Sequence, residues 1–139
     1  MLLRYSKLIS FLLILFFSST LYAEDILIIH QNYGNTHSKH KNRLENAGHT
    51  VTMQNTSSSY SYTAANYDQV YDIRYSYTSY STADKDRFKA VLSNGGTVYL
   101  VGENGNFDSR NDAIVSFLQE VTGDNNIAHS GNSCCGSGA

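Results

Sequence analysis

Residues 97–123, TVYLVGENGNFDSRNDAIVSFLQEVTG, decide the fold more clearly than any other stretch of the sequence. Val98–Val101 is apolar throughout, which predicts a strand buried on both faces. Beyond a polar loop, apolar side chains recur at the spacing of one helix face, at Ile114, Phe117, Leu118 and Val121. Gly123 predicts the end of that helix. A buried strand that runs directly into an amphipathic helix indicates an α/β protein.

The same alternation extends back to residue 25. Ile26–Ile29 predicts a second strand buried on both faces, and shorter patterns predict strands at 50–54 and 69–74. Helices are predicted at 36–47 and 82–94, each ending at a glycine, and a fifth strand is predicted to begin at 126–129. Helical crossovers between buried strands favour a three-layer α/β sandwich around a short, mainly parallel sheet of about four to five strands.

The first 23 residues have the anatomy of a secretory signal peptide. Arg4 and Lys7 precede the apolar run Leu8–Phe17, and a small residue, Ala23, closes the segment. We therefore expect a signal peptide at 1–23, an α/β domain at 24–125 and a flexible or truncated tail at 126–139. The expected location is secreted or periplasmic, with no membrane association once the signal is removed.

Composition excludes some partners. Residues 24–139 carry 8 Lys and Arg against 12 Asp and Glu, a formal charge of −4, so a nucleic-acid partner is not expected. The two cysteines, Cys134 and Cys135, are adjacent in the tail, so they predict neither a disulfide framework nor a CxxC metal site. His37 and His40 share a helix face without a third ligand at a diagnostic spacing, and we expect them to be solvated.

Candidate ligand-binding residues lie in the loops that follow the strands, because ligands of open parallel sheets bind beyond the carboxyl ends of the strands. The first loop enters a helix, whose backbone amides can hold an anion. Arg110 is expected either to form a surface ion pair with Glu103 or Asp108, or to meet an anionic ligand. The candidates are His30, Asn32, Gly34, Asn35, Thr36, Tyr75, Tyr77, Glu103, Asn104, Asn106 and Arg110.

Tyrosine is concentrated between positions 60 and 80 and is interleaved there with serine and threonine. Such a surface offers flat amphipathic area and adaptable hydrogen bonds, which suits a protein or glycan partner. The alternative is that these tyrosines cover a thin core. The candidate patch consists of Tyr60, Tyr62, Tyr75, Tyr77 and Tyr80.

Two family resemblances bear on function. Gly34-Asn35-Thr36 resembles part of the phosphate-binding loop of flavodoxins, although Gln31 and Tyr33 depart from that pattern. This resemblance implies a flavodoxin-like three-layer sandwich with an FMN or anion site. Most of residues 25–123, including SNGG before the strand and loop quoted above, resembles the class I glutamine amidotransferase-like superfamily. Catalytic members carry a Gly-x-Cys-x-Gly turn, where this chain has Asn104, which is not a nucleophile. The resemblance implies the fold and a non-catalytic exported relative.

Three functional hypotheses remain from the sequence. The first is an exported, non-enzymatic α/β domain that acts as a binding or accessory module, without an identified cofactor, catalytic residue or metal. The second is a flavodoxin-like FMN or anion binder that uses Gly34-Asn35-Thr36. The third is an inactive fragment of a larger secreted protein.

Overall fold

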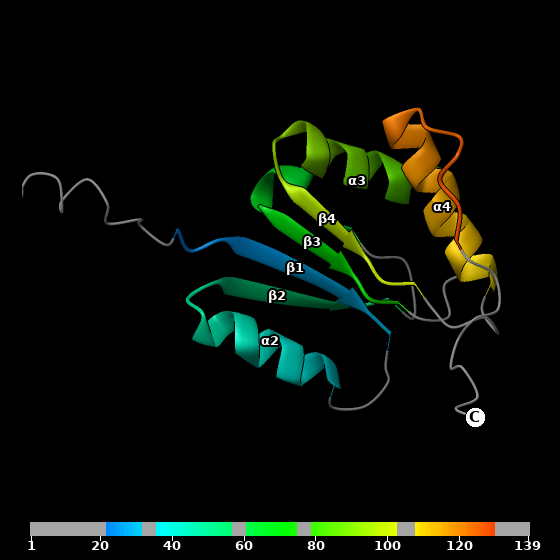
Figure 1. Cartoon of the computed structure of the whole chain (residues 1–139). Coiled ribbons are helices and arrows are strands. Elements are labelled where there is room, and N and C mark those ends of the chain that lie inside the picture. Colours follow the sequence, from blue (N-terminus) through cyan, green and yellow to red (C-terminus); the bar gives the residue numbers. More distant parts are fainter. Residues whose placement is uncertain (1–21, 32–35, 57–60, 75–78, 103–107, 130–139) are drawn as a thin grey trace, which may run out of the picture.

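Four parallel strands form one sheet with helices on both faces (Figure 1). The computed structural model describes residues 22–31, 36–56, 61–74, 79–102 and 108–129. The elements are β1 (Asp25–His30), α2 (Thr36–Asn46), β2 (Thr50–Asn55), the short 3-10 helix η1 (Ala64–Asn66), β3 (Gln69–Asp72), α3 (Thr82–Ser93), β4 (Thr97–Leu100) and α4 (Asp108–Thr122). The predicted α/β class with a short parallel sheet is therefore confirmed.

The strand order is β2-β1-β3-β4, and β1 is the strand around which the sheet is built. Its four apolar residues alternate between the faces: Ile26 and Ile28 pack on the α2 side, and Leu27 and Ile29 pack on the α3 side. All four are at most 1% exposed. Burial on both faces explains why this strand reads as an unbroken apolar run.

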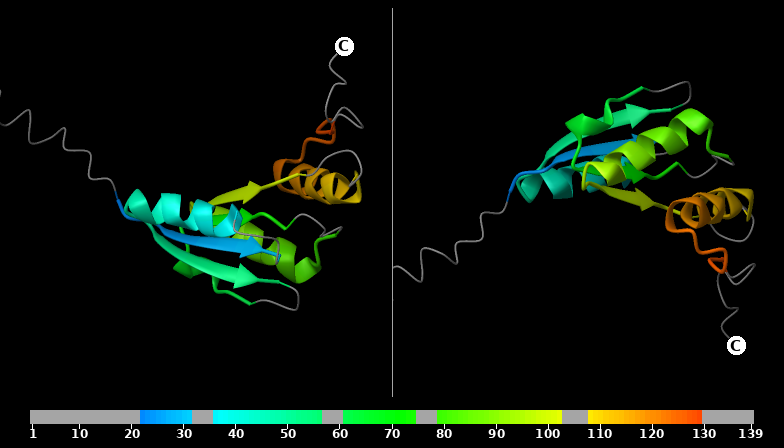
Figure 2. Two further views of the ribbon diagram at one scale, coloured as in Figure 1. Left: turned by 90° about the horizontal axis from the view of Figure 1, so that it is seen from below. Right: turned by 90° about the horizontal axis from the view of Figure 1, so that it is seen from above.

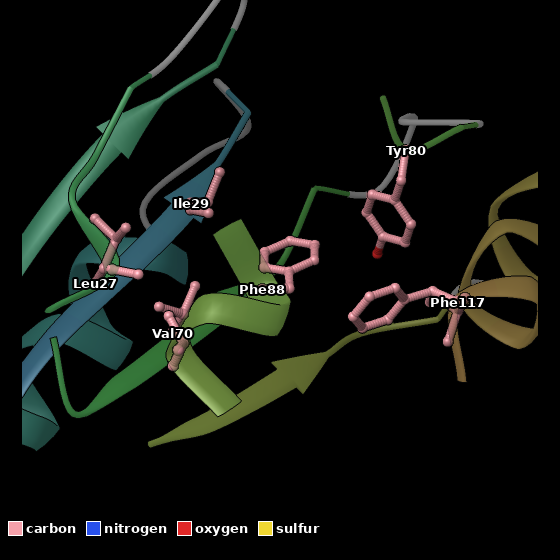
Figure 3. Close-up of a cluster of buried hydrophobic side chains, with 9 residues drawn as sticks. Leu27, Ile29, Val70, Tyr80, Phe88 and Phe117 are labelled. Carbon is pink, nitrogen blue, oxygen red and sulfur yellow. The ribbon is translucent and has the colours of Figure 1, made fainter. Parts of the chain in front are cut away.

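The two faces of the sheet are covered unequally. On one face, α2 packs beside β1 and β2 through Leu44. The other face has α3 and α4, which contribute Phe88 and Phe117 to the larger core cluster (Figures 1 and 3). The views from below and above show α2 and α3 on opposite sides of the sheet (Figure 2). Lys85 of α3 also contacts Glu120 of α4, with 2.8 Å between Nζ and Oε2.

On the α2 face, β3 and β4 are left partly open. Tyr71 of β3 stacks on Tyr99 of β4 with 4.3 Å between ring centroids, and Tyr99 is 43% exposed. Val101, just past β4, is 46% exposed. α2 reaches this part of the sheet through His40, whose ring centroid lies 5.3 Å from that of Tyr71. Within the described residues, no strand pairs with the outer edge of β4.

The predicted start of a fifth strand at 126–129 is wrong. Residues 125 and 126 form a turn, and residues 127–129 have no regular structure. Polar contacts hold this segment against α4: the Gln119 side chain donates to the Ile127 carbonyl at 2.9 Å, and His129 lies 2.9 Å from Asp112. The segment does not join the described four-stranded sheet.

Local signals at the helix ends act as the sequence indicates. Ser81 and Asp84 form a reciprocal capping box at the start of α3. Gly95, after α3, has φ +82°, a backbone conformation that residues with a Cβ rarely adopt. At Gly96 a Cβ would lie 2.7 Å from the Asp68 carbonyl and 2.8 Å from Val91, so the turn from α3 into β4 needs a residue without a side chain.

Core packing predicts that alanine substitutions at two positions of α3, one helical turn apart, lower the free energy of unfolding by very different amounts. Phe88 is fully buried, so Phe88→Ala is expected to lower the free energy of unfolding by about 3–5 kcal/mol through lost burial and a residual cavity. Leu92, on the same helix, is 39% exposed, and Leu92→Ala is expected to cost less than about 1 kcal/mol. Urea unfolding followed by circular dichroism measures both. Equal losses would contradict the assignment of Phe88 to the core.

Candidate functional site

The carboxyl ends of all four strands lie at one edge of the sheet, because the strands are parallel. Three sequence-predicted site residues fall within the described chain: His30 ends β1, Thr36 begins α2, and Arg110 lies in the first turn of α4. The other candidates lie outside the described residues: Asn32, Gly34, Asn35, Tyr75, Tyr77, Glu103, Asn104 and Asn106.

A carboxylate buried at this edge is the centre of the site. Asp72 is the last residue of β3 and pairs in register with Ile29 of β1 and Leu100 of β4. It is 0% exposed and follows the buried Val70 at the two-residue spacing of one strand face. A buried carboxylate needs a positive partner and hydrogen bonds.

Arg74 supplies that partner from the same segment. Its Nε lies 2.8 Å from Oδ1 of Asp72 and its Nη2 lies 2.7 Å from Oδ2, which makes a bidentate contact. The Arg74 backbone N–H also donates to Oδ1 at 3.2 Å. Both side chains are fully buried. The paired geometry is that of the stronger arginine–carboxylate contacts.

Arg110 reaches the same carboxylate from α4. Its Nη2 lies 3.4 Å from both Oδ2 and the backbone carbonyl of Asp72, and its Nε lies 3.4 Å from the Val101 carbonyl. The Arg110 side chain is 0% exposed, so the prediction that it forms a surface ion pair, with Glu103 or Asp108, is wrong. Arg110 instead joins the start of α4 to the ends of β3 and β4.

Tyr80 connects this charged cluster to the apolar core. Its ring centroid lies 5.1 Å from the guanidinium carbon of Arg110 and 5.8 Å from that of Arg74, within the range of cation–π attraction. The ring also contacts Phe88 and Phe117 edge-on, at 5.4 and 6.1 Å (Figure 3). We call Asp72, Arg74, Tyr80 and Arg110 the Asp72 cluster.

Tyr80 and Tyr62 do not form the exposed patch suggested by the tyrosine-rich sequence. Tyr80 is buried and Tyr62 is partly buried against the same core, as the alternative of tyrosines covering a thin core predicts. Tyr60, Tyr75 and Tyr77 lie outside the described residues.

The opposite face of the sheet presents histidines at the same edge. His30 and His37 lie with ring centroids 5.0 Å apart, and each has a ring nitrogen within 3.4 Å of the Gln31 carbonyl. The pKa of His30 is lowered from its ordinary value. Burial is the main cause and the nearby His37 also lowers the pKa, whereas the contact with the Gln31 carbonyl partly offsets them by raising it. Among the described residues, no group of three His, Cys, Asp or Glu side chains is placed to hold a metal ion.

The described part of the chain also has a cavity of about 430 Å³ at the opposite, amino edge of the sheet. Tyr67, Asp68 and Gly96 are among its lining residues. It lacks the convergence of buried charges from separate elements that marks the Asp72 cluster. We therefore place the candidate site at the carboxyl edge.

The sequence did not identify Asp72 and Arg74 as site residues. The available signal was a charged residue at a buried strand position. In the segment QVYDIR, Asp72 lies two residues after Val70, so both side chains point to the same face of the strand. Its partner Arg110 lies 38 residues further along the chain, a distance over which no local pattern indicates pairing.

The chain matches no protein-family model, no curated protein and no solved structure. The resemblance to the glutamine amidotransferase-like superfamily therefore stays a prediction. In the described part of the chain, no helix is both long and apolar enough to cross a lipid bilayer.

Removing the central negative charge tests the Asp72 cluster. Asp72→Asn leaves Arg74 and Arg110 buried without their shared carboxylate and is expected to cost about 3–5 kcal/mol of unfolding free energy. Asp112→Asn is the matched control, because the Asp112 side chain is 71% exposed and its pair with His129 is worth less than about 1 kcal/mol. Denaturant unfolding of both variants measures the difference, and similar losses would show that the cluster does not carry stability.

Tyr80 gives a prediction at high pH. Burial raises the pKa of Tyr80 above its ordinary value of 10.0, and the Asp72 carboxylate raises it further. The contribution of Tyr80 to the free energy of unfolding is fully present below pH 10 and declines above it. The reason is that the unfolded chain then releases a proton that the folded chain keeps. We expect the alkaline decline in melting temperature to be smaller in Tyr80→Phe than in the wild type. An unchanged decline would contradict the assigned environment.

Proposed function

We propose that the chain is an exported, non-enzymatic α/β binding module whose ligand binds at the carboxyl edge of the sheet, next to the Asp72 cluster. The observation that carries the proposal is the convergence there of buried polar side chains from three separate segments: the end of β3, the residues before α3, and the first turn of α4. Nothing about the apolar core requires charges at this position.

The topology supports the same edge. β1 lies between β2 and β3 in the sheet. The helix that connects β1 to β2, α2, covers one face, and the helix that connects β3 to β4, α3, covers the other. The carboxyl ends of β1 and β3 therefore flank the point where the strand order reverses, which is where open α/β sheets bind ligands. His30 and Asp72 end these two strands.

The residues of the cluster suit binding rather than chemistry. Arginine stays protonated in proteins and supplies only hydrogen-bond donors, and Asp72 has both carboxylate oxygens engaged by Arg74. In the sequence, the turn that corresponds to the catalytic elbow of the resembled superfamily carries Asn104. Residues 1–23 support export, and the expected partner is a protein or a glycan.

A second candidate uses the start of α2. This helix begins at Thr36, directly after Gly34 and Asn35, so its first-turn amides lie near the same edge as the end of β1. The strand order β2-β1-β3-β4 also matches the first four positions of the flavodoxin order 2-1-3-4-5. The second candidate is therefore an FMN or anion site at residues 34–36.

Nuclear magnetic resonance of the ¹⁵N-labelled chain, residues 24–139, separates these proposals. Soluble glycans and FMN are added separately, and backbone amide shifts are mapped. The first proposal expects changes at Ile73, Arg74, Val101 and Gly102 with a glycan. FMN shifts centred on the start of α2, at Thr36 and His37, would favour the second. Shifts confined to Asp68 and Gly96, at the amino edge, would overturn both.

A further inference from the structure

We infer that the group bound next to the Asp72 cluster is an oxyanion, a carboxylate or a phosphate, and that Arg110 is the residue that binds it. This inference rests on the proposed function, because it names the chemical class of the ligand at that same edge. It starts from a difference between the two arginines of the cluster.

Arg74 and Arg110 share one carboxylate unequally. Arg74 lies 2.7 and 2.8 Å from the two oxygens of Asp72, distances typical of charge-assisted hydrogen bonds. Each hydrogen-bond contact of Arg110 is 3.4 Å long, beyond the usual 2.7–3.2 Å range. Arg74 therefore holds Asp72 tightly, and Arg110 is left with weak contacts.

One nitrogen of Arg110 has no contact of this kind. Among the residues that the structure describes, its Nη1 has no hydrogen-bond partner, although the whole side chain is 0% exposed. A buried charged donor without an acceptor is costly, and native proteins satisfy such groups with water, an ion or a ligand. We therefore expect Nη1 of Arg110 to bind one more hydrogen-bond acceptor.

The chemistry of the position favours an anion as that acceptor. Nη1 and Nη2 form a planar fork that matches two oxygens of a carboxylate or phosphate, and Nη2 has only long contacts to give up. Arg110 also lies in the first turn of the 15-residue helix α4, where the helix dipole favours negative charge. A water molecule would fill one donor position without balancing the guanidinium charge.

Burial limits the shape of the ligand. Because Arg110 is 0% exposed, a ligand reaches its Nη1 only when the side chains that cover it move aside. The entering group therefore has to be small and terminal, with the rest of the ligand remaining outside the cluster. An acidic sugar or a phosphorylated glycan meets this requirement. A neutral sugar does not supply the charge.

The test uses three probes on the ¹⁵N-labelled chain, residues 24–139: inorganic phosphate, glucuronate, and glucose as the neutral match to glucuronate. All are added at constant ionic strength adjusted with chloride. We expect phosphate and glucuronate to shift the Nε–H resonance of Arg110 and the amides of Ile73, Arg74 and Gly102. Glucose is expected to shift neither set. This measurement needs no variant, so it does not depend on a mutant that folds.

Two matched variants test the role of the fork. Arg110→Lys keeps the charge but loses the planar pair of donors, and we expect it to weaken glucuronate binding about tenfold or more. Arg87→Lys is the control, because Arg87 lies on α3 beside Asp84 and Tyr62, and we expect unchanged affinity. Circular dichroism checks that both variants are folded.

The outcomes separate this inference from the proposed function. If glucose shifts the edge amides as strongly as glucuronate does, the anion assignment fails and the site stands. If a glycan binds at this edge while the Arg110 resonance stays unchanged with every probe, Arg110 is not the binding residue and the inference fails. If no probe or glycan shifts the carboxyl edge, the proposed function fails with it.

Discussion

A carboxylate buried inside a parallel sheet has to be neutralised where it lies, and the position of Asp72 imposes this constraint on the surrounding structure. Arg74 turns back onto it directly after β3, Arg110 brings the first turn of α4 against the ends of β3 and β4, and Tyr80 places a ring against both guanidinium groups. The arrangement of α4 and of the residues before α3 therefore follows from one buried charge as well as from apolar packing.

Local sequence patterns predicted the layers of the fold, because strands buried on both faces and amphipathic helices each impose a short-range period. Ile26–Ile29 and Phe88 illustrate this, and the Ser81–Asp84 capping box was readable from two residues three positions apart. The candidate site was less predictable. Arg110 was identified as a candidate, but its environment was not, because its partner Asp72 comes from an element 38 residues away that meets α4 only in the folded chain.

The two faces of the sheet carry different chemistry. On the α3 side, the charges of the Asp72 cluster are enclosed by aromatic rings. On the α2 side, His40 contacts Tyr71, and Tyr71 stacks on the exposed Tyr99. Helices cover β1 on both faces, whereas β4 is covered mainly on one face. This is the arrangement of a doubly wound fold. Within the described residues, the outer edge of its sheet, at β4, is unpaired.

The all-parallel strand order also determines how the domain reaches its native state. No two of the strands in the described residues form a hairpin. β1 pairs with β2 across α2 and with β3 across a still longer stretch, so each of these pairings closes a long loop before it gains a contact. Such topologies fold slowly. The 139 residues contain no proline, so prolyl isomerisation adds no slow phase to the refolding of this chain.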